Sequence, residues 1–308
     1  MKHVLRAPLF LLFTGSSHRA GRGNSSYKPR SKATFSSLST KQILLYTLLA
    51  LCFSCSGYKK LPLPTRPAAA LSGAEFYRKA AAYNWQQRDS LAVREILSGN
   101  MPAFLKRLVP IPVTAQDSAG KLLQATFYVM PDYLGVGHDA DWARVPLTPM
   151  AAQQLADSLN CFLPTRKMVD AIYRHAAVKL EPLPLYALRD STPTMYQHHL
   201  MIEGQRQGRK GLIAGIKKDV VISDKVSRDP RPNRVAIYGW HRLDGKPIQP
   251  LYSGHVNWYV DYSHGVRLVY RQVKLGNKWV DYTEALRDPK LRRLLSDEES
   301  SDFTGYPY

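Results

Sequence analysis

Residues 235–275 read VAIYGWHRLDGKPIQPLYSGHVNWYVDYSHGVRLVYRQVKL, and this stretch decides the fold class. Its valine, isoleucine and aromatic runs are separated by turns rich in Gly, Asp and Pro, which is the pattern of short strands joined one after another. Strands joined by short turns favour antiparallel pairing. Together with the residues just before it, the stretch predicts strands at 212–216, 220–223, 235–238, 256–262 and 266–275.

Helical signals dominate upstream of this stretch. Thr148 followed by Pro149 indicates a helix start, because threonine caps the first turn and proline suits the first helical position. Met168 and Ile172 lie on one apolar stripe of a later helix. We expect helices at 72–96, 148–160, 165–178 and 283–295, and two earlier strands at 104–114 and 122–130. The predicted fold class is therefore α+β, with a helical N-terminal half packed on a largely antiparallel sheet from the C-terminal half.

The N-terminal region carries a targeting signal. An apolar run of 11 residues, Ile43–Phe53, is followed by Ser54 and Cys55. It is shorter than the roughly 20 residues of a transmembrane helix but suits the apolar core of a signal peptide. A small residue before a cysteine resembles a bacterial lipoprotein signal, in which the cysteine is lipidated. We therefore predict that Cys55 anchors the chain to a membrane of the bacterial cell envelope, with the domain outside the cytoplasm.

Four segments are expected along the chain. The signal and targeting region covers residues 1–54, in which residues 1–40 are either an extension of the gene model or an Arg/Ser-rich transit peptide. Three prolines between positions 62 and 67 favour an extended spacer, so residues 55–71 are predicted to hold the lipidated cysteine and a tether. Residues 72–296 are expected to form a single globular domain, and residues 297–308 a loose tail.

The chain carries a net charge of +19 at pH 7. Eight of its 43 basic residues and none of its 24 acidic residues lie in residues 1–54, so residues 55–308 carry a net charge of +11. A basic balance attracts anionic partners such as acidic lipid or peptidoglycan, and an ordinary solvated basic surface is the alternative interpretation. Nucleic acid is not an expected partner, because no recognised nucleic-acid-binding module occurs.

Three histidines, His241, His255 and His264, crowd into the quoted stretch. If the residues after His255 are extended, His255 and Asp261 share one face, because side chains alternate along a strand. The glycine after His264 permits a bend that turns this histidine back toward Asp261. Two histidines and a carboxylate form a familiar zinc set that leaves one position for water. We therefore predict zinc ligands at His255, Asp261 and His264, and assign proton transfer to His241 and Lys218, with His241 as a fourth ligand in an alternative arrangement. Histidines that only form hydrogen bonds within a sheet rich in Tyr and Trp are the alternative interpretation.

The same stretch resembles an uncharacterised family of exported bacterial proteins. Three motifs carry the resemblance: IYGWH at 237–241, PIQPL at 247–251 and DYSHGVRLV at 261–269. The likeness extends back through most of the predicted domain, and it implies one coherent exported domain. No activity is established for that family, so the resemblance implies no reaction.

The histidine–aspartate–histidine set is also similar to that of the zinc peptidases that cut peptidoglycan cross-links. Their Trp-His element follows the ligands, however, whereas here Trp240 and His241 precede them. The predicted function is a metal-dependent hydrolase of peptidoglycan peptides or related envelope polymers. The alternative is a non-enzymatic lipoprotein that binds an anionic glycan or peptide in a basic, aromatic cleft. The expected substrate-binding residues are Trp240, Trp258, Tyr262 and Lys217.

The anchoring prediction is tested by replacing Cys55 with serine in the full chain. Serine lacks the thiol that takes the lipid, so Cys55→Ser should leave the membrane fraction or accumulate as an unprocessed precursor. Membrane fractionation and mass spectrometry of the mature N-terminus measure this. Cys52→Ser is the matched control and should stay membrane-bound. A soluble wild-type chain without an acyl group would contradict the prediction.

Overall fold

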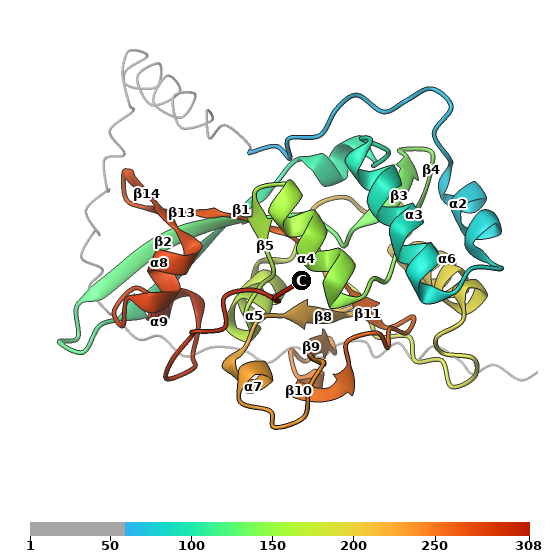
Figure 1. The fold of residues 1–308 in the computed structure, drawn as a ribbon. Helices are drawn as coiled ribbons and strands as arrows, with labels where there is room; N and C mark the ends of the chain where they lie inside the picture. Colours follow the sequence, from blue (N-terminus) through green and yellow to red (C-terminus); the bar gives the residue numbers. More distant parts are fainter. Residues whose placement is uncertain (1–58) are drawn as a thin grey trace, which may run out of the picture. The chain divides into compact units, whose positions relative to one another are not determined.

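Figure 1 shows residues 59–308, the part of the chain that the computed structural model describes. Most of its helices begin at a side-chain cap, η1 (Ala103–Lys106) and α9 (Arg292–Leu295) being the exceptions. Thr148 accepts a hydrogen bond from the amide of Ala151, and Thr165 accepts one from the amide of Met168, so two helices start where the sequence predicts. The helices are α2 (Gly73–Ala80), α3 (Trp85–Leu97), the 3-10 helix η1 (Ala103–Lys106), α4 (Pro149–Ser158), α5 (Arg166–His175), α6 (Thr192–Arg206), α7 (Asp224–Ser227), α8 (Tyr282–Arg287) and α9 (Arg292–Leu295).

The predicted helix at 72–96 is two helices, α2 and α3. Asn84 accepts a hydrogen bond from the amide of Gln87, and the Gln87 side chain accepts one from the amide of Asn84. This reciprocal cap starts a new helix inside the predicted one. A second difference is α6, which the sequence analysis missed although Ser191 caps it and Pro193 stands in its first turn.

The strands build two main sheets. The first has the order β14-β13-β2-β12-β5, with β1 beside β2, and all its pairings are antiparallel. The second has the order β10-β9-β8-β11, in which only the short β11 runs parallel to its neighbour. The predicted α+β fold with largely antiparallel sheets is confirmed. The strands are β1 (Val109–Gln116), β2 (Leu122–Val129), β3 (Gly135–His138), β4 (Asp141–Arg144), β5 (Cys161–Phe162), β6 (Val178–Lys179), β7 (Ile213–Ala214), β8 (Lys218–Val221), β9 (Arg234–His241), β10 (Pro247–Val256), β11 (His264–Gly265), β12 (Val269–Tyr270), β13 (Gln272–Leu275) and β14 (Lys278–Asp281).

The strand predicted at 256–262 is wrong. β10 ends at Val256, and the chain makes an irregular turn before β11 begins at His264. The carboxylate of Asp261 accepts a hydrogen bond from the amide of Ser263, which draws the backbone away from a strand ladder. His255 and Asp261 therefore do not lie on one face of a continuous strand, contrary to the prediction.

Both ends of the described chain pack on the domain, so the predicted domain boundaries at 72 and 296 are too narrow. Leu61, in the predicted tether, is buried and its amide donates to the carbonyl of Lys106. Tyr306, in the predicted loose tail, is buried against β8 and β9. Its hydroxyl donates to the carbonyl of Val221 and accepts from the amide of Ala236, so both tail and tether contribute to the folded unit.

The predicted targeting region lies outside the described residues, as does the predicted lipidation site at Cys55. Among the helices of residues 59–308, none combines the length and the apolar character needed to cross a membrane. Residues 59–308 belong to one compact unit, and its C-terminus ends beside α4 (Figure 1).

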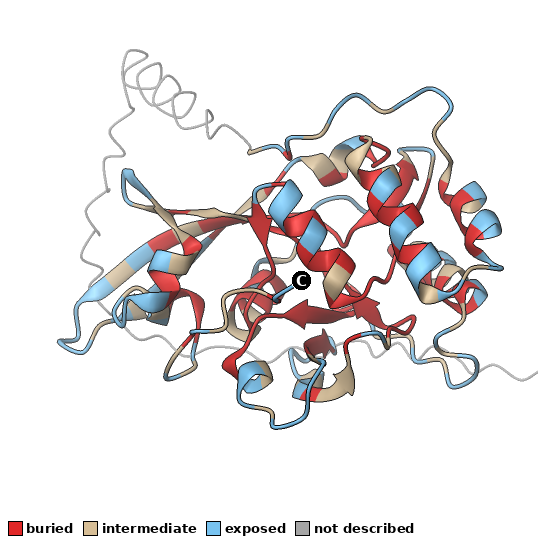
Figure 2. Cartoon of the chain, in the orientation of Figure 1, coloured by how far each residue is buried: buried red, intermediate tan, exposed pale blue. Residues whose placement is uncertain are grey.

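The larger helices turn a buried face inward and an exposed face to solvent (Figure 2). On α5, Met168 and Ile172 are buried in the main core, whereas Arg174 is exposed. The apolar stripe predicted from the sequence therefore faces the interior. Val169, on the same helix, packs with Val221 of β8, so α5 covers one face of the second sheet.

The orientation of α5 is tested by replacing Ile172 with alanine. The truncation leaves a cavity among well-packed side chains, so Ile172→Ala should lower the free energy of unfolding by about 2–5 kcal/mol. Urea unfolding followed by circular dichroism measures the change. Arg174→Ala, on the exposed face of the same helix, is the control and should change stability by less than about 0.5 kcal/mol. Equal effects of the two substitutions would contradict the assignment of the buried face.

Candidate functional site

The turn between β10 and β11 is held by the buried carboxylate of Asp261. Its Oδ1 atom accepts hydrogen bonds from the amide of Ser263 at 2.8 Å and from the Ser263 hydroxyl at 2.5 Å. Its Oδ2 atom accepts from the guanidinium of Arg189 at 2.8 Å and from the Tyr259 hydroxyl at 3.3 Å. The carboxylate thus joins the turn to the segment that precedes α6.

Two predicted site histidines lie beside this carboxylate. The ring centroids of His255 and His264 are 5.6 Å apart, and that of Tyr259 is 4.9 Å from His255. The register of β11 with β8 places Lys218 opposite His264. We call this group the histidine cluster; its members are Arg189, Lys218, His255, Tyr259, Asp261 and His264.

The charges of the histidine cluster follow from burial and proximity. Burial raises the pKa of Asp261, but interaction with His264 and the hydrogen bonds from Ser263 outweigh it, so this pKa lies below its usual range. Burial lowers the pKa of His264 to about 3, although Asp261 opposes the shift. Burial also lowers the pKa of His255, against the same opposing charge. Near neutral pH the cluster therefore holds a charged carboxylate and two neutral imidazoles.

His241 does not join the histidine cluster, contrary to the prediction. Its Nε2 atom is 2.9 Å from the carboxylate of Asp170 on α5. Its ring stacks on Tyr173, with centroids 4.6 Å apart, and meets the edge of Tyr238. The left-handed backbone conformation of Trp240, with φ of 58°, interrupts the strand alternation just before His241. His241 therefore stabilises the contact between α5 and β9, and no observation supports its predicted proton-transfer role.

The predicted zinc ligands are neighbours, but they are not arranged as a ligand set. Both oxygens of Asp261 are engaged by Ser263, Arg189 and Tyr259, and the positive guanidinium occupies the side that a cation would need. Within residues 59–308, no three His, Cys, Asp or Glu side chains are grouped so that they could hold a metal ion. The geometry therefore gives no support to the predicted zinc site at His255, Asp261 and His264.

Three of the predicted substrate-binding residues are core residues. Trp240 is buried with its ring beneath the ammonium group of Lys218, at 5.2 Å from the centroid. Tyr262 is buried, and its hydroxyl exchanges hydrogen bonds with the backbone of Leu185. Both aromatic side chains pack in the core and neither lines the cleft described below, so the geometry gives no support to their predicted ligand contacts.

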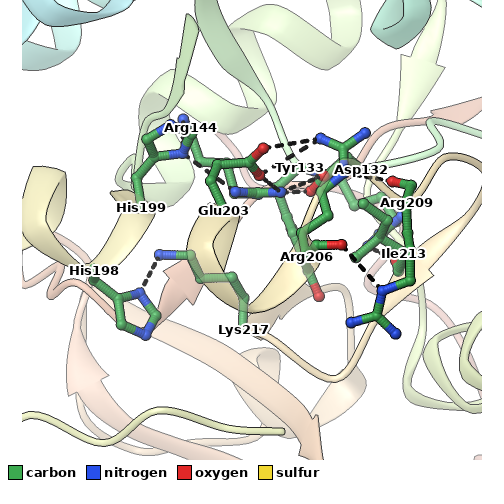
Figure 3. A network of polar contacts seen from close by, with 11 residues as sticks. Asp132, Tyr133, Arg144, His198, His199, Glu203, Arg206, Arg209, Ile213 and Lys217 are labelled. Carbon is green, nitrogen blue, oxygen red and sulfur yellow. Dashed lines mark hydrogen bonds and ion pairs between the residues drawn. The ribbon is translucent and has the colours of Figure 1, made fainter. Parts of the chain in front are cut away.

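Lys217 also points into the protein. Its Nζ atom is 3.1 Å from Nδ1 of His198 (Figure 3). The same atom also donates to the carbonyl of Tyr262. Burial, followed by repulsion from Arg144, lowers the pKa of Lys217 to about 7. The geometry therefore gives no support to the substrate contact predicted for Lys217, whereas Lys218 belongs to the histidine cluster.

Helix α6 is fixed in place by a buried ion network (Figure 3). The guanidinium of Arg144 donates to both oxygens of Asp132, at 2.9 and 2.6 Å, and lies 2.8 Å from the carboxylate of Glu203 on α6. His199, also on α6, accepts from the amide of Arg144. These long-range contacts fix α6, whose N-terminal end faces the turn between β10 and β11.

An aromatic cleft of about 520 Å³ adjoins the histidine cluster at Tyr259. Its aromatic walls come from two distant segments, the break between α2 and α3 with Tyr83 and Trp85, and the turn after β10 with Trp258 and Tyr259. Arg88 lines it, together with the segment that leads into α6. Trp258, a predicted substrate-binding residue, also lines the cleft and is 46 % exposed. Tyr83 and Trp85 were missed, although two aromatic residues flanking the cap at Asn84 are a visible signal.

The buried histidines predict loss of stability in mild acid. Burial lowers the pKa of His198 to about 2 and that of His264 to about 3. The unfolded chain, with histidine pKa near 6.5, binds more protons below that pH, so stability falls as the pH falls from about 6.5 toward 3. At pH 5 each histidine should cost about 2 kcal/mol relative to pH 7.5. Asp219 opposes this in part, because burial raises its pKa to about 6 and the folded form then gains a proton.

Urea unfolding at pH 7.5 and pH 5 measures the effect. His264→Asn removes one titrating group, so it should reduce the loss between the two pH values by about 2 kcal/mol. His175→Asn, at an exposed position, is the control and should leave the loss unchanged. An identical loss in wild type and His264→Asn would contradict the prediction.

No protein-family model, curated protein or solved structure matches the chain. The resemblance to exported bacterial proteins therefore stays a prediction.

Proposed function

We propose that the chain is an exported lipoprotein, anchored through Cys55, whose domain binds an anionic glycan of the cell envelope in the aromatic cleft. Peptidoglycan is the candidate polymer. The observation that carries the proposal is the cleft itself, a concave site lined by aromatic side chains from two segments that are distant in the sequence. Sugar rings present apolar faces that stack on aromatic rings, as apolar surfaces generally do.

The charge of the chain supports an anionic ligand. Residues 55–308 carry a net charge of +11. The histidine cluster beside the cleft contains two cations, Arg189 and Lys218, and one buried carboxylate, that of Asp261. Such an excess of positive charge draws an anionic polymer toward the site and suppresses binding of cationic ones.

The rigidity of the site supports binding of an extended polymer without rearrangement. One wall is fixed by the reciprocal cap between Asn84 and Gln87 at the start of α3. The other is fixed by Asp261, which ties the turn after β10 to Arg189. A preformed cleft retains more of its contact energy as affinity, because less ordering is needed on binding.

The proposal is tested by cosedimentation of the full chain, purified in detergent, with insoluble peptidoglycan. Trp258→Ala removes an exposed stacking surface, so it should raise the dissociation constant about tenfold, equivalent to about 1.4 kcal/mol. Trp279→Ala is the matched control: Trp279 is 40 % exposed but lies on β14, beside Lys59 and outside the cleft. It should leave binding unchanged. Equal losses in both variants, or none in Trp258→Ala, would contradict the proposal.

A further inference from the structure

Arg88 is a buried cation whose guanidinium is only partly paired. The side chain lies in the first turn of α3, lines the aromatic cleft and is 3 % exposed. Among residues 59–308, neither its Nε nor its Nη2 atom has a hydrogen-bond partner. Buried guanidinium nitrogens are normally paired, because removing a charged donor from water without a replacement is costly.

The nearest carboxylate does not satisfy Arg88. Nε of Arg88 lies 3.6 Å from Oδ1 of Asp89, beyond hydrogen-bond distance. The other oxygen of Asp89 accepts from the amide and hydroxyl of Thr148, at 3.0 and 2.7 Å. Asp89 is thereby directed toward the start of α4, and its Oδ1 is itself unpaired. The two residues therefore form an ion pair, but no hydrogen bond of ordinary length joins them.

Two helix N-termini face the same cleft and favour the same sign of charge. Asn84 and Ser191, the N-caps of α3 and α6, both line it. Neither helix has an acidic residue in its first turn, whereas α2 carries Glu75 there. The neutral side chains of Asn84 and Ser191 cap these ends, so no acidic residue of the first turn offsets either helix dipole and both favour an external anion. Asp190 is the one acidic residue among those lining the cleft, and it is exposed.

We infer that the cleft selects an acidic sugar, whose carboxylate pairs with Arg88 while its ring lies between the aromatic walls. A planar guanidinium matches a carboxylate through two parallel hydrogen bonds, which gives orientation as well as affinity. In peptidoglycan glycan strands freed of peptide, every second sugar is N-acetylmuramic acid with a free lactyl carboxylate. The inference rests on the proposed function and names the sugar that the cleft distinguishes.

Two tetrasaccharides of the same backbone separate acid recognition from stacking. One is chitotetraose, built from neutral N-acetylglucosamine. The other alternates N-acetylglucosamine with N-acetylmuramic acid and carries no peptide. Calorimetric titration of the full chain in detergent should show that the acidic sugar binds about tenfold more tightly, with a preference that declines as salt is added.

Variants of Arg88 assign the preference to this side chain. Arg88→Met should bind the two sugars equally, with its affinity for chitotetraose retained. Arg88→Lys keeps the charge but loses the planar pair of donors, so it should show an intermediate preference. Arg234→Met is the matched control, because Arg234 also has a buried unpartnered Nε but lies on β9, outside the cleft; it should keep the wild-type preference.

The outcomes distinguish the inference from the proposed function. If wild type binds both sugars equally and Trp258→Ala weakens both, the proposed function holds and the inference is overturned. If neither sugar binds, both fail. A preference for the acidic sugar that persists in a folded Arg88→Met also overturns the inference. Thermal unfolding checks each variant, and if Arg88→Met does not fold, the wild-type preference and that of Arg88→Lys decide.

Discussion

The carboxylate of Asp261 is the contact on which the site depends. One of its oxygens shapes the turn between β10 and β11 through Ser263, and the other ties that turn to Arg189. Arg189 stands just before α6, so one buried side chain positions the histidine cluster and one edge of the aromatic cleft together. Arg189 is partly exposed but Asp261 is buried, so removing its partners would leave a buried carboxylate without compensation.

A second constraint acts from the far end of α6. Arg144, held by Asp132, binds the carboxylate of Glu203 in a buried network, and this fixes the helix against the two-stranded β3–β4 sheet. The N-terminal ends of α3 and α6 then meet at one cleft. Packing that orients helix ends in this way places partial positive charge at a site before any ligand arrives. The fold therefore supplies shape, aromatic surface and charge from segments that are remote in sequence.

Local signals predicted much of the fold but not its long-range contacts. The caps at Thr148 and Thr165 are short-range patterns, and both helices begin where they indicate. The β-rich run after His255 does not form the predicted strand, because the Asp261 side chain accepts a backbone hydrogen bond that a strand partner would otherwise receive. Helix α6 was missed because its buried face includes His198, His199 and Arg206 in place of an apolar stripe.

The sequence predicted only those parts of the candidate site that depend on neighbouring residues along the chain. Trp258 was expected to bind ligand and does line the aromatic cleft, because it stands at an exposed turn. Trp240 and Tyr262, equally aromatic and close in sequence, are buried by contacts that the sequence does not display. The other wall, with Trp85 and the partly paired Arg88, lies about 170 residues away along the chain, and only tertiary packing brings it near.

The most direct test of acidic-glycan binding in this cleft uses the indole signals of the five tryptophans. Nuclear magnetic resonance of the full chain with isotope-labelled tryptophan, titrated with the acidic tetrasaccharide, reports each indole separately. Trp85 and Trp258 line the cleft, so their signals should shift together and saturate at the same ligand concentration. The remaining signals, from Trp142, Trp240 and Trp279, should stay in place. Shifts confined to those three, or no shift at all, would contradict the account.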